Sequence, residues 1–247
     1  MLYYIHDTEV VMKKSIFDQR LEHNKEKQSS YTSAFWCEDD PELSESVCKL
    51  MTAFHATKIS MGNQLEDTIA SVVENSNKFA YYDKSSTDEF NFSKPGDFYI
   101  KRFKFKIEDL EKYNIILKGK KAISIDGLAR IGNTIYIVEL KDGNGFDTKK
   151  SQGEMESLLK CLNYMRNRFG NTYRIETKFV LWNCDNLANS SVKTTTNRES
   201  ICTGADYCDT IGISKKLVDK GRKKAKQGNI RSFLSHAKQL LGGNNDS

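Results

Sequence analysis

The sequence has few of the features that mark secreted, membrane-spanning or zinc-binding proteins. It contains six cysteines among 247 residues, and no two of them form a CxxC pair, which disfavours a disulfide scaffold and a structural zinc site. No apolar run approaches the roughly 20 residues that a membrane helix needs. The first residues also lack the basic start and apolar segment of a signal peptide. We therefore expect a cytoplasmic protein with reduced thiols and no membrane partner.

Residues for several common chemistries are also scarce or badly spaced. The four histidines lie far apart without the spacing of metal ligands, and no elbow motif surrounds a serine or cysteine nucleophile. Gly119-Lys120-Lys121 lacks the upstream glycine and the Ser or Thr of a phosphate-binding loop. In contrast, 38% of the residues are hydrophobic. This is enough apolar material for a folded core and excludes wholesale disorder.

Basic side chains are concentrated near the end of the chain. Between Ser214 and Leu241 there are nine lysines and arginines against Asp219 alone, so this stretch carries +8 and the rest of the chain, at a total of +5, carries −3. Such a cluster, which includes Lys223 and Lys224, can neutralise the phosphates of a nucleic acid. The same pattern is typical of a solvated surface helix, and charge alone leaves both interpretations open.

Hydrophobic spacing predicts strands interleaved with helices. Four segments have the pattern of strands: 97–105, 122–131, 134–140 and 175–182. Two have the apolar spacing of amphipathic helices: 62–75 and 151–169. The first 60 residues indicate further helix, 76–94 is predicted to be loose and polar, and 203–207 is predicted to be a tight loop. This order predicts an α/β or α+β architecture around one sheet.

The residues with the clearest chemistry lie in the hairpin predicted over 122–140. Gly132-Asn133 signals a two-residue loop, which pairs residues whose numbers add to 265. Asp126 then faces Glu139 at about 5 Å between Cβ atoms, and the period of two places Lys141 on the same face as Glu139. Two opposed carboxylates repel each other, and a hard divalent cation such as Mg²⁺ removes this penalty.

Two carboxylates, a metal and a lysine suit phosphodiester hydrolysis. The metal polarises the ester and lowers the pKa of a bound water, while the lysine can hold the attacking hydroxide or offset charge on the phosphorus. The alternative is a solvated surface hairpin in which Glu139 and Lys141 form an incidental ion pair. The apolar residues on both sides of these positions argue against full exposure.

The pattern Asp126, twelve residues, Glu139-Leu140-Lys141 is similar to the signature of PD-(D/E)XK nucleases, with isoleucine in place of its proline. The resemblance is best over residues 62–165. It implies an α/β fold with a restriction-endonuclease-like core, in which helices flank a central mixed β-sheet. It also implies catalytic roles for Asp126, Glu139 and Lys141, with Mg²⁺ bound by the two carboxylates near the carbonyl of Leu140.

The segment 61–67 resembles a helix that precedes the hairpin in type II restriction endonucleases, where a glutamate joins the metal site. On a helical wheel Glu66 lies beside Val73 at the edge of the buried stripe, whereas Asp67 and Glu74 point away from it. The resemblance therefore implies a catalytic role for Glu66. An ordinary exposed helix glutamate is the alternative.

The segment after the hairpin is expected to meet the substrate. The resemblance implies a loop and then a helix that borders the active site. Gln152 would orient water or a phosphate there, and Lys149 and Lys150 would contact the DNA backbone. A helix N-terminus also favours phosphate through its free N–H groups. The two lysines fit ordinary surface positions equally well.

Together these features imply a type II restriction endonuclease with a single nuclease domain over 1–247, comprising a helical region (1–60), a catalytic core (62–182) and a loop-rich basic region (183–247). It would hydrolyse double-stranded DNA at a short specific sequence with Mg²⁺ and leave 5′-phosphates. A palindromic target would call for a homodimer. The alternatives are a structure-specific or repair nuclease of the same fold, a non-catalytic DNA-binding module, and an RNase.

Overall fold

The computed structural model describes residues 45–116, 121–143, 148–187 and 198–242. The chain divides into two compact units. One unit contains Met1–Met61 and Lys224–Ser247, and the other, here called the sheet unit, contains Gly62–Lys223. The prediction that residues 1–247 form one nuclease domain stays a prediction.

Two long helices have residues in both units. They are α2 (Glu45–Asn75) and α6 (Lys215–Gly242). In the described part of the first unit, the rings of Phe54 on α2 and Phe233 on α6 meet edge to face. Within the described segments, no helix combines the length and the apolar character needed to cross a bilayer.

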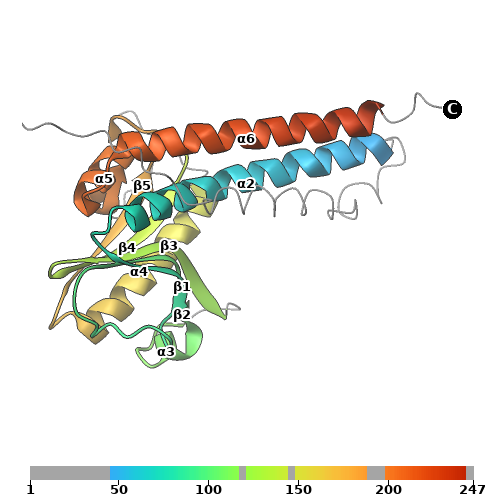
Figure 1. Ribbon diagram of the computed structural model, residues 1–247. Helices are drawn as coiled ribbons and strands as arrows, with labels where there is room; N and C mark the ends of the chain where they lie inside the picture. The colour runs from blue at the N-terminus through green and yellow to red at the C-terminus, as the bar shows by residue number, and fades with distance from the viewer. Residues whose placement is uncertain (1–44, 117–120, 144–147, 188–197, 243–247) are drawn as a thin grey trace, which may run out of the picture. The chain divides into compact units, whose positions relative to one another are not determined.

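A six-stranded mixed sheet forms the centre of the sheet unit (Figure 1). Its strands lie side by side in chain order: β1 (Ala80–Ser86), β2 (Phe98–Lys106), β3 (Ala122–Ile131), β4 (Thr134–Lys141), β5 (Arg174–Leu181) and β6 (Ile201–Thr203). Strands β2, β3 and β4 are antiparallel to their neighbours in this group, whereas the pairs β1–β2, β4–β5 and β5–β6 are parallel. The predicted α/β fold with a mixed sheet flanked by helices is confirmed.

Apolar side chains cover both faces of the sheet, so helices pack on each side. Helix α4 (Thr148–Phe169) connects β4 to β5, and α5 (Gly204–Ile211) follows β6. One core cluster joins the sheet to α4 and includes Phe103, Ile137, Leu158, Met165 and Phe179. The other joins the sheet to α2 and α5 and includes Leu65, Ile69, Val138, Val180 and Tyr207.

The hairpin between β3 and β4 has the loop and register that the sequence predicts. Ile131 pairs with Thr134, and the pairing stays in register as far as Gly127 and Val138. Gly132 has a φ of 55°, a left-handed conformation that glycine adopts without steric cost. The hairpin thus ends in a two-residue loop, as the Gly-Asn pair predicts.

An irregular row of residues crosses the sheet beside this hairpin. Lys84 in β1 and Arg102 in β2 have φ values of 61° and 59°. The strand pairing passes over both residues, and on β3 it passes over Asp126, which lies opposite Arg102 in the register. In a regular strand, side chains three positions apart point to opposite faces of the sheet. Ile100 and Phe103 instead point into the same core cluster, so the irregular residue between them interrupts this alternation. We call Lys84, Arg102 and Asp126 the irregular row.

Two sequence-based predictions about secondary structure are wrong. The stretch 76–94 contains β1, whose polar residues suit its position at the edge of the sheet. Residues 203–207 are not a tight loop, because Thr203 begins α5 through a capping box with Asp206. Helix α4 also begins three residues before the predicted start, at Thr148. Most of the predicted N-terminal helical region, residues 1–44, lies outside the described residues.

Candidate active site

Asp126 lies where strands β3 and β4 stop pairing. The last pair of the hairpin ladder is Gly127 with Val138, and beyond it the Asp126 carboxylate takes a backbone partner. Its Oδ2 accepts a hydrogen bond from the N–H of Leu140 at 2.7 Å, while the Leu140 side chain is buried in the core. The ladder therefore does not contain the predicted pair of Asp126 and Glu139, and Asp126 instead binds the backbone of the residue that follows Glu139 in β4.

The carboxyl groups of Asp126 and Glu139 both have raised pKa values in this structure. Burial, followed by repulsion from Glu139 and Glu66, raises the pKa of Asp126 to about 8. Burial also raises the pKa of Glu139 and outweighs the opposing effect of Lys141, and repulsion from Glu154 and Glu66 adds smaller contributions in the same direction. The sequence predicted two carboxylates that would repel each other, and the structure places a third acid, Glu66, within the same field.

Lys141 lies between two carboxylates. Its Nζ is 3.0 Å from Glu139 Oε1 and 2.8 Å from Glu154 Oε2. Burial lowers the pKa of the Lys141 ammonium, but these two partners raise it by more. Lys141 is therefore protonated at neutral pH. Sequence reasoning missed Glu154. A signal was available, because Glu154 directly precedes Met155 on the buried stripe of a helix that was already expected to border the site.

Glu66 extends from α2 toward the sheet, as the helical wheel predicts. Its Oε2 lies 2.6 Å from Nε of Arg102, and the exposed fractions of the two side chains are 12% for Glu66 and 31% for Arg102. Repulsion from Glu66 contributes to the raised pKa values of both Asp126 and Glu139. The structure therefore gathers Glu66 with the hairpin acids, and it adds an arginine that sequence reasoning did not single out.

Asp67 lies on the opposite side of α2 from the apolar stripe, as the helical wheel predicts, but that side of the helix is also buried. Asp67 is 5% exposed, and its Oδ1 lies 3.2 Å from Nζ of Lys101, which is 1% exposed. Asp83 supplies a second carboxylate to the same ammonium at 3.0 Å. Helix α2 is enclosed on more than one side, since a Cβ at Gly221 on α6 would lie 2.8 Å from Thr68. A single apolar stripe on a helical wheel does not reveal a second covered side.

The donor chemistry of the site fits Mg²⁺. Among the described residues, no group of three or more His, Cys, Asp or Glu side chains is arranged to hold a metal ion. The site carboxylates instead bind protein donors: Asp126 binds the Leu140 N–H, Glu66 binds Arg102, and Glu139 and Glu154 bind Lys141. The hard carboxylate oxygens of Asp126 and Glu139 are nevertheless suited to a hard divalent cation.

Among the described side chains, the structure brings none of the other residues predicted to contact DNA or water together with the carboxylates of the candidate site. Gln152 is exposed, and its Nε2 donates to Glu156 Oε1 at 3.3 Å. Residues 149 and 150 belong to α4, but the side chains of Lys149 and Lys150 lie outside the described residues. Lys223 is exposed on α6 within the sheet unit, and Lys224 is exposed in the other unit. Their proposed contacts with DNA stay predictions.

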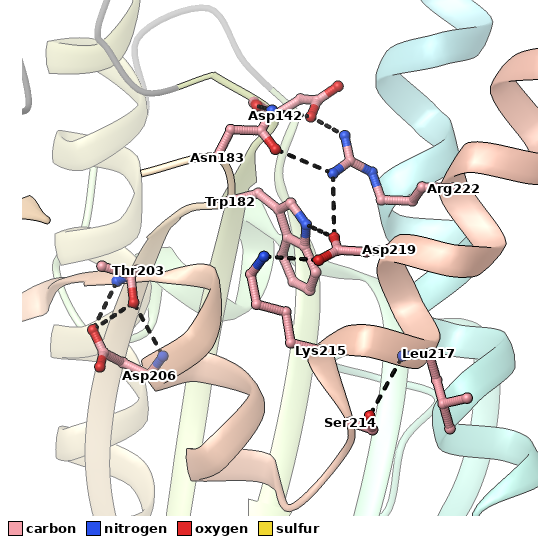
Figure 2. A network of polar contacts seen from close by, with 10 residues as sticks. All are labelled: Asp142, Trp182, Asn183, Thr203, Asp206, Ser214, Lys215, Leu217, Asp219 and Arg222. Atoms are coloured by element: carbon pink, nitrogen blue, oxygen red, sulfur yellow. Dashed lines mark hydrogen bonds and ion pairs between the residues drawn. The ribbon is translucent and has the colours of Figure 1, made fainter. Parts of the chain in front are cut away.

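The end of β4 is tied to α6 directly after Lys141. Asp142 forms an ion pair with Arg222, and Asn183 donates its Nδ2 hydrogens to the carbonyl and the side chain of Asp142. Nη1 of Arg222 also lies 3.4 Å from Asn183 Oδ1 (Figure 2). These contacts fix the strand end that carries the candidate catalytic lysine.

Trp182 extends the same network. Its Nε1 donates to Asp219 Oδ1 at 2.8 Å, and Lys215 forms an ion pair with Asp219 Oδ2 at 2.8 Å (Figure 2). The cationic groups of Lys215 and Arg222 also lie 5.6 and 5.8 Å from the centre of the Trp182 ring. Two basic residues of the predicted phosphate-binding tail are therefore engaged within the protein.

Comparison with known proteins supports the resemblance on which this site was predicted. The type II restriction enzyme HhaII of Haemophilus parahaemolyticus is 29% identical to this chain over 199 residues, which span 78% of the chain and 83% of that enzyme. The two proteins are homologous. The aligned region is longer than the sheet unit, so the similarity is not confined to the hairpin motif. No protein-family model matches the chain, and no solved structure matches it either.

Proposed function

We propose that this protein is a type II restriction endonuclease. It would hydrolyse both strands of DNA at a short specific sequence and leave 5′-phosphate and 3′-hydroxyl ends. The observation that carries the proposal is the combination of homology across most of HhaII with Asp126, Glu139 and Lys141 at one end of one hairpin. Homology to a restriction enzyme supports DNA as the substrate, and the acidic site supports hydrolysis.

Asp126 and Glu139 would hold a divalent cation, with the Leu140 carbonyl beside them and Glu66 adjusting the site or binding through water. When bound, Mg²⁺ would polarise the phosphodiester. The protein supplies two carboxyl groups whose pKa values are raised by burial and by repulsion from neighbouring acids. This arrangement favours a cation over a proton most strongly once the pH exceeds the raised pKa of Asp126.

Lys141 would act as a cation rather than as a general base. Its pKa is raised by Glu139 and Glu154, so the ammonium keeps its proton at neutral pH. It can therefore offset the charge that develops on the phosphorus, or hold the attacking water by donating a hydrogen bond. The oxygen of water bonds to the phosphorus, the bond between the phosphorus and the 3′ oxygen breaks, and a proton released by the water ends on that oxygen to give the 3′-hydroxyl.

A palindromic target would require two copies of the chain, because one such site cuts one strand. The exposed lysines of α6, including Lys223 and Lys224, would supply affinity for the DNA backbone. Reading of the base sequence would fall to other side chains.

The proposal is tested by incubating the purified protein with phage DNA and Mg²⁺ and sequencing the fragment ends. We expect discrete bands with ends at one short sequence. Preference for branched DNA would instead favour a structure-specific nuclease, and equal digestion of RNA would favour an RNase. Binding without cleavage in any divalent cation would favour a DNA-binding module.

Lys141→Ala tests the assigned chemistry. We expect cleavage to fall by about 10³-fold or more while DNA binding is retained. Lys178→Ala is the matched control, because Lys178 is also a strand lysine paired with a glutamate, at 3.2 Å from Glu176. Cleavage by Lys141→Ala at the rate of Lys178→Ala would contradict the role of Lys141.

A further inference from the structure

Arg102 has an unusual position beside the candidate active site. It belongs to the irregular row and lies opposite Asp126 in the register of β2 and β3. Its φ of 59° places a non-glycine side chain in the left-handed region, which costs about 1–2 kcal/mol. A residue in this conformation is stable only where the surrounding structure holds it, and such strain is common at ligand-binding sites.

The guanidinium of Arg102 is only partly used by the protein. Its Nε binds Glu66 Oε2 at 2.6 Å, and among the residues that the structure describes no hydrogen bond is formed by Nη1 or Nη2. The side chain is 31% exposed, and the buried side-chain nitrogen and oxygen atoms without a partner among the described residues do not include Nη1 or Nη2. Both nitrogens are therefore in contact with solvent. A planar pair of N–H donors on an anchored guanidinium matches the geometry of a phosphate, which Arg binds with two parallel hydrogen bonds.

The charges around the site explain why a cation is needed there. Glu66, Asp126, Glu139 and Glu154 place four acids near the point where a polyanionic backbone must approach, and Lys141 is already shared between two of them. Arg102 is the other cation in direct contact with a site carboxylate among the described residues. Without it, phosphate would meet mainly negative charge.

We propose that Arg102 is a phosphate-binding residue of this active site, anchored through Nε to Glu66 and presenting Nη1 and Nη2 to a DNA phosphate at the scissile position or next to it. This proposal rests on the proposed function, because it requires that DNA be the substrate. It adds to the three hairpin residues a contact that acts on the substrate itself.

The test measures how DNA binding depends on salt. The wild type and three variants, Arg102→Gly, Arg102→Lys and Lys84→Gly, are titrated in EDTA with a DNA fragment that the wild type cuts once. Single-turnover cleavage of the same fragment is then measured in Mg²⁺. Lys84→Gly is the matched control: it changes a residue of nearly the same φ, on the neighbouring strand, whose side chain is exposed. Glycine suits the left-handed backbone at both positions, so both variants are expected to fold.

Each phosphate contact contributes about 0.9 to the slope of log K against log salt. We expect Arg102→Gly to lower the slope by about 1 and to reduce cleavage by about 100-fold. Arg102→Lys should keep the slope, because it keeps the charge, but should cleave slowly, because it lacks the paired donors. Lys84→Gly should match the wild type in both measurements.

A wild-type slope in Arg102→Gly would overturn the proposal. If cleavage falls while the slope is unchanged, Arg102 acts only by positioning Glu66, and the phosphate contact is wrong. Failure of the proposed function is seen separately, since the wild type itself would then leave the fragment uncut before any variant is compared.

Discussion

The raised pKa of Asp126 makes a strong prediction about stability. The pKa is raised from 3.8 to about 8, so the folded protein holds a proton on this carboxyl that the unfolded chain has already released. Between these two values the folded state binds more protons, and the free energy of unfolding must fall as the pH rises. Asp126→Asn removes the titrating group, and the variant should therefore lose this part of the decline.

The size of the effect follows from the shift. About four pKa units at 1.36 kcal/mol each give an upper limit of about 5 kcal/mol at pH 8 and above. The asparagine side-chain oxygen can still accept the Leu140 N–H, and the raised pKa of Asp126 already includes the effect of the charge on that bond. We expect Asp126→Asn to exceed the wild type by up to about 5 kcal/mol at pH 8, or about 10–20 °C in melting temperature for a chain of this length.

The assay is thermal unfolding in metal-free buffer at about pH 4.5 and at pH 8, and the gain at the acidic pH should be only about 1 kcal/mol. Asp185→Asn is the control, because Asp185 is exposed in the same unit. Mg²⁺ should raise the melting temperature of the wild type by mass action and leave Asp126→Asn unchanged, and the variant should not cleave DNA. A melting-temperature difference between Asp126→Asn and wild type that is equal at both pH values would refute the reasoning.

Two further variants test other contacts. Glu154→Gln removes one of the carboxylates that raise the pKa of Lys141, so the alkaline limb of the pH–rate profile for cleavage should move to lower pH. Glu156→Gln, which changes an exposed residue on the same helix, should leave the profile unchanged. Equal profiles for the two variants would contradict the role of Glu154. Arg222→Ala removes the ion pair with Asp142 and the cation beside Trp182, and should lower the free energy of unfolding by about 1–2 kcal/mol in urea. A loss no larger than that of Lys223→Ala, at the exposed neighbouring position, would show that this network adds no stability.

The hairpin was predictable because residues close together in the sequence determine its loop and its register. The Gly132-Asn133 loop fixes the register, and the register determines which side chains meet as far as Gly127 and Val138. Amphipathic spacing similarly located α4 and the part of α2 that carries Glu66. These features depend on residues close together in the sequence, so pattern reasoning could reach them.

The rest of the site depends on contacts between distant segments. Arg102 meets Glu66 from 36 positions away, and nothing in the alternation of β2 indicates a left-handed residue at its centre. The β1 segment was missed because an edge strand with polar side chains lacks the hydrophobic pattern of a buried one. The burial of Asp67 depends on Lys101, and a single helical wheel cannot supply a partner from another strand.

The two edges of the sheet limit how copies of this chain could join. Strand β1 is polar and is interrupted by the left-handed Lys84, while β6 has three residues. Both are poor templates for adding a strand from another molecule. A homodimer that straddles a palindrome would therefore have to be assembled through helices or loops, not through a continuous intermolecular sheet.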